Sequence, residues 1–130
     1  MKKIIFWTSV CMYFAVPAWA DGVYGTWSFP EQNLGFVTLD MSLIVNSTSL
    51  TIESVCKYPD GVNTNAQVSS TASITATSIQ ALQSNSSNNS NDPNHTCQAS
   101  ISAGEMDYSV SGNALTLNYQ GQTIQLTRTQ

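Results

Sequence analysis

Charged side chains are scarce in this chain of 130 residues, where Asp, Glu, Lys and Arg together account for 9% of the sequence. Lysine and arginine number four, and two of them, Lys2 and Lys3, lie at the N-terminus. A protein that binds nucleic acid needs a cluster of cations to neutralise successive phosphates. This composition therefore argues against nucleic acid as a partner.

Residues that carry catalysis or bind metals are equally rare. His95 is the only histidine, and it follows a polar stretch in which a lone imidazole is expected to be solvated. No serine stands in a glycine-flanked nucleophile motif. No close set of cysteine, histidine and carboxylate side chains has the spacing of a metal site. We therefore expect no enzyme activity, no metal and no cofactor.

A long apolar run occurs once, at the start of the chain. Lys2 and Lys3 precede a mostly apolar stretch at 4–16, and Ala18 and Ala20 place small residues where a signal peptidase reads. The stretch is too short to span a bilayer. We predict that residues 1–20 are a cleaved bacterial secretory signal, and that the protein is periplasmic or extracellular.

Removal of the signal leaves residues 21–130, with Lys57 and Arg128 against eight carboxylates and a formal net charge of −6. Such a charge keeps an exported protein soluble, and no second apolar run predicts insertion into a membrane. A segment of this length forms one domain. We expect a single domain and a monomer.

Two cysteines remain after cleavage, Cys56 and Cys97. In an oxidising compartment, an even number of cysteines without metal-type spacing indicates a disulfide. Closing a loop of about 40 residues stabilises a fold by roughly 4 kcal/mol on the chain-entropy model. We predict a Cys56–Cys97 disulfide.

Apolar residues alternate with polar ones along most of the chain, which is the period of strands with one buried face. The pattern predicts strands over 37–45 and 50–56, joined as a hairpin. It predicts two more over 64–69 and 71–79, with small inward side chains that suit either a ligand cavity or a thin packed barrel. The expected inward residues of these four strands are Val37, Leu39, Met41, Leu43, Val45, Leu50, Ile52, Cys56, Ala66, Val68, Ala72, Ile74 and Ala76.

Between the middle and the last third the chain is nearly all Ser and Asn. This segment has almost no apolar side chain that could anchor it to a core. We predict a mobile polar loop near 83–95, inserted within the single domain rather than separating two domains.

The last third predicts a meander, with strands over 97–103, 106–110, 115–119 and 124–128 joined by short glycine-containing turns. A first strand near 23–29 brings the number to eight or nine. The expected fold is all-β, a single antiparallel up-and-down barrel of about eight strands. A β-sandwich is the alternative.

Three features resemble the lipocalin and calycin group: Gly25-Thr26-Trp27 on the first strand, the run of hairpins, and Arg128 in phase with Ile124 and Leu126 on the last strand. The resemblance implies that Trp27 closes one end of the barrel beneath Arg128. The Thr-Asp-Tyr motif of that group is absent from the sequence.

These observations predict an exported, non-enzymatic binding protein. In one hypothesis a small apolar molecule lies inside the barrel. The expected ligand-lining residues are Leu39, Met41, Ile52, Ile74, Tyr108 and Leu117. In the alternative, the barrel is filled and the protein is an interaction module, such as an inhibitor, adhesin or effector. That module contacts a protein partner through its loops or a strand edge.

Overall fold

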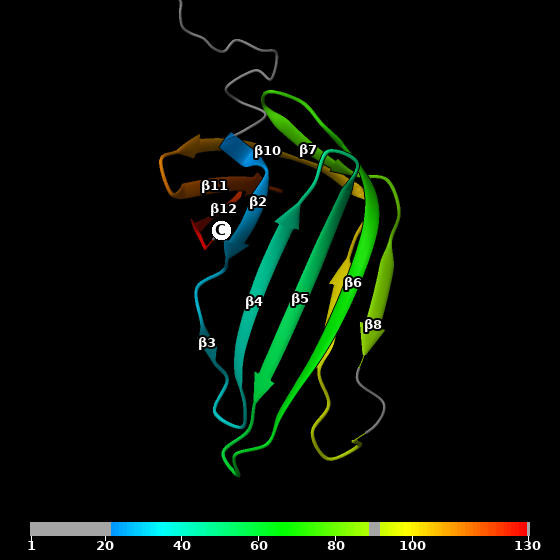
Figure 1. Ribbon diagram of the computed structural model, residues 1–130, viewed down its shortest axis with the longest axis vertical. Helices are drawn as coiled ribbons and strands as arrows, with labels where there is room; N and C mark the ends of the chain where they lie inside the picture. Colours follow the sequence, from blue (N-terminus) through cyan, green and yellow to red (C-terminus); the bar gives the residue numbers. More distant parts are fainter. Residues whose placement is uncertain (1–21, 89–91, 130) are drawn as a thin grey trace, which may run out of the picture.

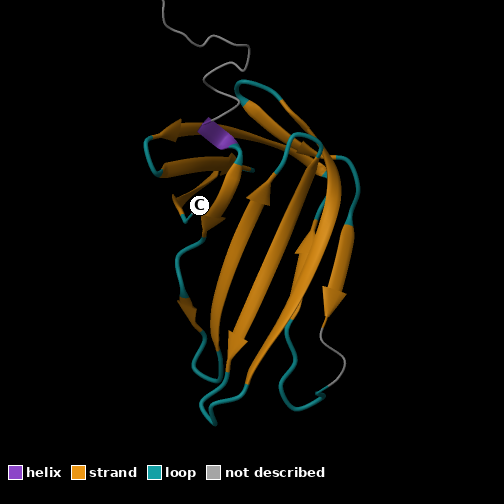
Figure 2. Ribbon diagram, viewed as in Figure 1, coloured by secondary structure: helices purple, strands orange, loops and turns teal. Residues whose placement is uncertain are grey.

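A computed structural model describes residues 22–88 and 92–129 of the chain (Figure 1). The predicted signal peptide at 1–20 lies outside these ranges. Strands make up the regular structure apart from one short helical segment at 22–23 (Figure 2).

Eight strands form a closed antiparallel barrel in which each strand pairs with the barrel strands before and after it in the sequence. β12 returns to pair with β2 and closes the ring. The predicted all-β up-and-down barrel is therefore confirmed. In barrel order the strands are β2 (Gly25–Ser28), β4 (Thr38–Val45), β5 (Ser49–Lys57), β6 (Asn63–Ile74), β7 (Ser78–Ala81), β10 (Gly104–Ser111), β11 (Ala114–Tyr119) and β12 (Gln122–Arg128).

Side-chain alternation fills the barrel as the sequence predicts. The largest fully buried side chain is that of Trp27. Strands that face one another contribute aliphatic residues at every second position, and the hydrophobic effect of burying them stabilises the closed sheet. The best-buried aliphatic members of this core are Val23, Leu43, Val45, Leu50, Ile79, Leu115, Leu117 and Leu126.

A short ninth strand, β3 (Gln32–Asn33), lies along the same edge of β4 as β2 does. β2 opposes residues 42–45 of β4, and β3 opposes Leu39 and Thr38. The N–H of Phe29 still donates to the carbonyl of Met41 at 2.9 Å, and one extra residue on the β2–β3 side lies between the two ladders. β2 and β3 are thus two pieces of one interrupted edge.

Two further strands, β8 (Asn85–Asn88) and β9 (Gln98–Ile101), pair only with each other among the described residues. β8 follows β7 along the chain and β9 precedes β10, so the pair continues the β7–β10 ribbon past the closed barrel. Ala81 opposes Gly104, and Asn85 opposes Ile101. One extra residue on the β7–β8 side is therefore accommodated between the two ladders, as in a β-bulge.

The β8–β9 pair packs against the β5–β6 side of the barrel, and Figure 1 shows β8 beside β6. The N–H of Leu82 donates to the carbonyl of Thr71 at 2.9 Å. The side-chain amide of Asn85 donates to the carbonyl of Ser69 at 2.7 Å. These bonds hold the start of the pair along β6.

Four sequence-based predictions were wrong in detail. The break expected between 64–69 and 71–79 does not occur, since β6 continues through Ser70. The Ser70 hydroxyl accepts a bond from the N–H of Gln83 at 3.1 Å, which satisfies this polar side chain inside the barrel wall. Ala76, expected to point inward on the second of these strands, is exposed in the turn between β6 and β7.

The other two corrections concern the segments around β8 and β9. Part of the predicted loop near 83–95 is a strand, because the backbone of β8 pairs with β9. Residues 89–91 lie outside the described residues. β9 was expected to form a hairpin with β10, but it runs on toward β10 and pairs with β8 instead.

Candidate functional site

Trp27 and Arg128 pack together where β12 pairs with β2 and completes the ring of strands. The Arg128 guanidinium carbon lies 4.2 Å from the centre of the indole ring. The guanidinium donates to the carbonyl of Tyr24 at 3.0 Å and also to the carbonyl of Gly22. The indole N–H donates to the carbonyl of Val23 at 2.8 Å. The polar groups of Trp27 and Arg128 are thus hydrogen-bonded to backbone carbonyls of the first segment.

A groove opens on the side of the barrel, between β9 and the chain around β3. Its floor is the inner face of β4 and β5, and its volume is about 560 Å³. We call it the lateral groove. Its lining residues are Phe29, Leu34, Phe36, Val37, Leu39, Met41, Ile52, Cys56, Thr96, Cys97, Gln98, Ala99 and Ser100.

A smaller cavity of about 250 Å³ lies inside the barrel next to the lateral groove. The two share Phe29, Ile52 and Ser100 as lining residues. We call this cavity the inner cavity. Its other lining residues are Leu43, Leu50, Ala81, Ile101, Ser102, Gly104, Met106, Leu117, Tyr119 and Ile124. An apolar occupant of the groove can therefore extend toward the barrel interior.

The lining of both spaces is uncharged. Its polar side chains are hydroxyls and the amide of Gln98, and the rest is aliphatic, aromatic or sulfur-containing. At the rim, Phe36 is 68% exposed and Leu34 is 50% exposed. Large apolar side chains gathered beside an apolar groove are typical of binding surfaces. The chemistry of the groove thus suits an uncharged, apolar occupant.

The structure places the six predicted ligand-lining residues in two groups. Leu39 and Met41 line the lateral groove, Leu117 lines the inner cavity, and Ile52 lines both. Neither Ile74 nor Tyr108 lines either space. Tyr108 is buried in the core, where its hydroxyl donates to the carbonyl of Thr75 at 2.6 Å, and Ile74 packs against the same core.

Sequence reasoning missed the far wall of the groove. Leu34 and Phe36 lie in the turn between β3 and β4, outside any alternating pattern, so strand periodicity does not indicate them. The sequence does contain a feature that points to them. Two large apolar residues flank Gly35, in a segment that lacks the alternation of a buried strand.

The predicted disulfide between Cys56 and Cys97 is confirmed. Its two Cα atoms lie 5.7 Å apart, and both cysteines are buried. The bond fixes the start of β9 to the end of β5. Since both cysteines also line the lateral groove, the disulfide holds two of its sides at a fixed spacing.

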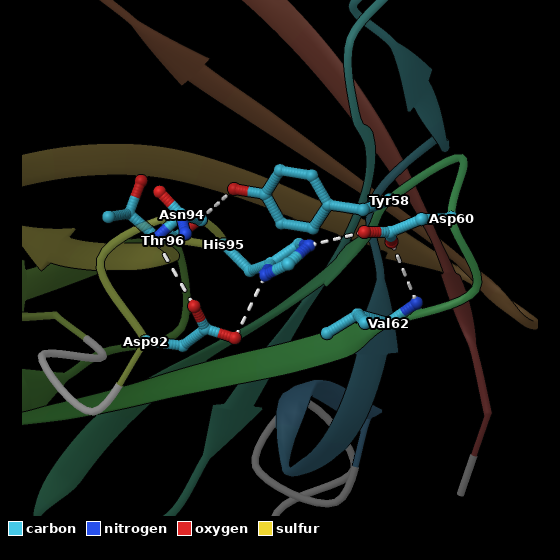
Figure 3. A network of polar contacts seen from close by, with 7 residues as sticks. All are labelled: Tyr58, Asp60, Val62, Asp92, Asn94, His95 and Thr96. Atoms are coloured by element: carbon cyan, nitrogen blue, oxygen red, sulfur yellow. Dashed lines mark hydrogen bonds and ion pairs between the residues drawn. The ribbon is translucent and has the colours of Figure 1, made fainter.

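Beside the disulfide lies a polar network that we call the His95 cluster, formed by Tyr58, Asp60, Asp92 and His95 (Figure 3). The imidazole Nδ1 lies 2.8 Å from the Asp92 carboxylate, and Nε2 lies 2.6 Å from the Asp60 carboxylate. The rings of Tyr58 and His95 meet edge to face at 4.8 Å. The Tyr58 hydroxyl donates to the carbonyl of Thr96. The cluster therefore joins the β5–β6 turn to the segment that enters β9.

The expectation of a solvated His95 was wrong. Its side chain is 17% exposed, because Asp60 comes from a turn 35 residues earlier in the chain and covers one side of the ring. The Asp60 carboxylate raises the pKa of His95 above its ordinary value, and Asp92 adds to the shift while partial burial opposes it. The His95 hydrogen bond and the backbone N–H of Val62 lower the pKa of Asp60.

Both ring nitrogens of His95 are occupied by carboxylates, and the geometry favours the protonated imidazolium between two anions. In this arrangement the ring cross-links two segments of the chain. Glu105 and Asp107, the other pair of nearby carboxylates, are exposed on the outer face of β10.

Within 22–88 and 92–129, no group of three or more His, Cys, Asp or Glu side chains is arranged so that it could hold a metal ion. In the same ranges, no helix is long and apolar enough to cross a bilayer. Comparison with family models, curated proteins and solved structures found no match to this chain.

Proposed function

We propose that this chain is an exported, non-catalytic binding protein whose apolar ligand occupies the lateral groove. The observation that carries the proposal is the groove itself, which combines a volume of about 560 Å³ with an uncharged lining. Leu39, Met41 and Ile52 on its floor are only half-buried. A ligand that covers them gains roughly 25 cal/mol for each Å² of apolar surface removed from water.

Three further features support this function. The N-terminal segment has the order of a secretory signal, which agrees with an exported role. The resemblance of Trp27 and Arg128 to the closed end of lipocalins agrees with a barrel that carries its ligand away from that end. Disulfide bonding of Cys56 to Cys97 suits an oxidising compartment.

The proposal is tested by binding an uncharged, environment-sensitive dye, N-phenyl-1-naphthylamine, to the mature protein. We expect saturable fluorescence enhancement. Leu34→Ser and Phe36→Ser remove apolar contact at the rim, and each weakens binding by about fivefold, which corresponds to about 1 kcal/mol.

The matched control is Leu82→Ser. Leu82 is 51% exposed, almost the same as Leu34, but it does not line the groove or the inner cavity. We expect this variant to bind the dye like the unmodified protein. An equal loss of dye binding in Leu82→Ser and Leu34→Ser would contradict the proposal, as would the absence of saturable binding.

A further inference from the structure

The second strand of the outer pair, β9, has a partner on one side only. Among the described strands it pairs with β8 alone, whereas β10, which follows it along the same ribbon, pairs with both β7 and β11. The β10–β11 ladder begins at Asp107, opposite Asn118, and β11 ends at Tyr119. The barrel wall on that side therefore stops before it reaches β9.

The unpaired edge of β9 faces the lateral groove. Five consecutive residues, from Thr96 to Ser100, line the groove. Successive side chains of a strand point to opposite faces of the sheet. Consecutive residues therefore line the same space where that space runs along the edge of the strand. The backbone of β9 thus forms one wall of an otherwise apolar groove.

Along a free strand edge, every second residue directs its N–H and C=O groups outward without a partner. A small apolar ligand that filled the groove would cover these groups and leave their hydrogen bonds unmade, which is unfavourable. An extended polypeptide satisfies them by adding a strand, and its alternate side chains reach the groove floor.

Edge strands in native proteins are normally guarded by lysine, proline, inward-pointing charges or a cover. The sequence of β9, Gln98-Ala99-Ser100-Ile101, contains no charge and no proline. The disulfide at Cys97 fixes the start of the strand before any partner arrives. A fixed edge without charge or proline loses little conformational freedom when it pairs.

We propose that the occupant of the lateral groove is an extended segment of another polypeptide, paired through its backbone with the free edge of β9. The groove floor carries Leu39 and Met41 at alternate positions of β4. Because its lining is uncharged, the groove selects a segment that carries an apolar side chain at every second position, where the side chains point inward. This inference rests on the proposed function and names the class of its ligand.

The test uses a pool of capped heptapeptides in which Val, Ile, Leu or Phe alternate with Thr. Binding is measured by displacement of N-phenyl-1-naphthylamine from the mature protein. The best-binding peptide is then made with N-methyl groups on alternate residues, in both phases. We expect methylation in the phase that faces β9 to weaken binding at least tenfold and methylation in the other phase to have little effect.

On the protein side, Ser100→Lys places a charge at the edge that faces the groove. Its matched control is Ser86→Lys, because Ser86 lies directly opposite Ser100 in the β8–β9 ladder, is also exposed and does not line the groove. We expect Ser100→Lys to weaken peptide binding at least tenfold. The Ser86→Lys variant should bind normally.

Three results overturn the inference. If the dye binds but no peptide displaces it, the groove takes a small apolar ligand and the proposed function stands without strand addition. If both methylation phases bind equally, the peptide is held by its side chains alone. If the protein forms a β9-paired dimer that excludes the peptides, the occupant is a second copy of this chain. Absence of dye binding as well removes the proposed function itself.

Discussion

Arg128 lies directly opposite Trp27 in the ladder that joins β12 to β2, so the two ends of the described chain meet where the barrel closes. The guanidinium covers one face of the fully buried indole and donates to two backbone carbonyls of the first segment. One side chain therefore ties the last strand to the first.

The Arg128→Ala variant should be destabilised by about 1–3 kcal/mol, since it loses a stacked cation, packing by the aliphatic stem and the bonds to the carbonyls. Urea unfolding followed by Trp27 fluorescence measures this directly, and the emission of the folded state should shift. The control is Lys57→Ala, which removes an exposed ion pair with Asp40 and should change stability far less than Arg128→Ala. Equal effects of the two substitutions would contradict a closing role for Arg128.

Ser54 and Ser70 form a matched pair of buried serines on neighbouring strands. The Ser54 side chain is completely buried and its hydroxyl has no hydrogen-bond partner among the described residues, whereas the Ser70 hydroxyl bonds to Gln83. Ser54→Ala should therefore stabilise the protein by about 1 kcal/mol, because it removes an unpaired buried hydroxyl. Ser70→Ala should destabilise it by about 1–2 kcal/mol. Thermal unfolding distinguishes the two, and a destabilised Ser54→Ala variant would show that its hydroxyl is satisfied.

Reduction of the Cys56–Cys97 bond should lower the free energy of unfolding by roughly 4 kcal/mol, as expected for a loop closed across a separation of 41 residues. It should also free β9 from β5. Hydrogen exchange should then accelerate in β9 more than in β11, which lies in the closed part of the barrel. Uniform acceleration along all strands would contradict a local role of the disulfide in holding the groove.

The His95 cluster predicts a pH window of stability. The pKa of His95 is raised from 6.5, so its contribution is full below pH 6.5 and is lost as pH rises through the raised value. The pKa of Asp60 is lowered from 3.8, so its contribution is full above pH 3.8 and is lost as pH falls through the lowered value. The cluster therefore contributes most between these two reference values.

Urea unfolding of the unmodified protein and of His95→Gln, at about pH 5.5 and pH 9, checks the window. The stability difference between the two proteins should be larger at the lower pH. Glu105→Gln, at an exposed carboxylate away from the cluster, controls for the effect of altered charge. A difference that stays constant with pH would show that His95 contributes by packing alone.

Local patterns in the sequence were enough to predict the barrel but not the groove. Alternation at Leu43, Val45, Leu115 and Leu117 reflects the geometry of each strand by itself, and the two cysteines that follow the predicted signal have one intramolecular pairing. These features need no knowledge of the rest of the fold. They account for the closed sheet and the disulfide.

The remaining features depend on contacts between distant segments. The free edge of β9 results from the end of β11 at Tyr119 and from the pairing of β9 with β8. The alternation of residues within β9 predicts neither of these features. His95 is covered by Asp60, which lies 35 residues away. Tertiary contacts of this kind override the local expectation of a solvated loop.

We propose that this protein binds its ligand in the lateral groove and not beside Trp27 and Arg128. The most direct measurement is a nuclear magnetic resonance titration of backbone amides and the Trp27 indole N–H with N-phenyl-1-naphthylamine. We expect shifts at Phe36, Met41 and residues 98–100, with the indole signal unchanged. Shifts that concentrate at Trp27 and Arg128 while the groove residues stay still would contradict this proposal.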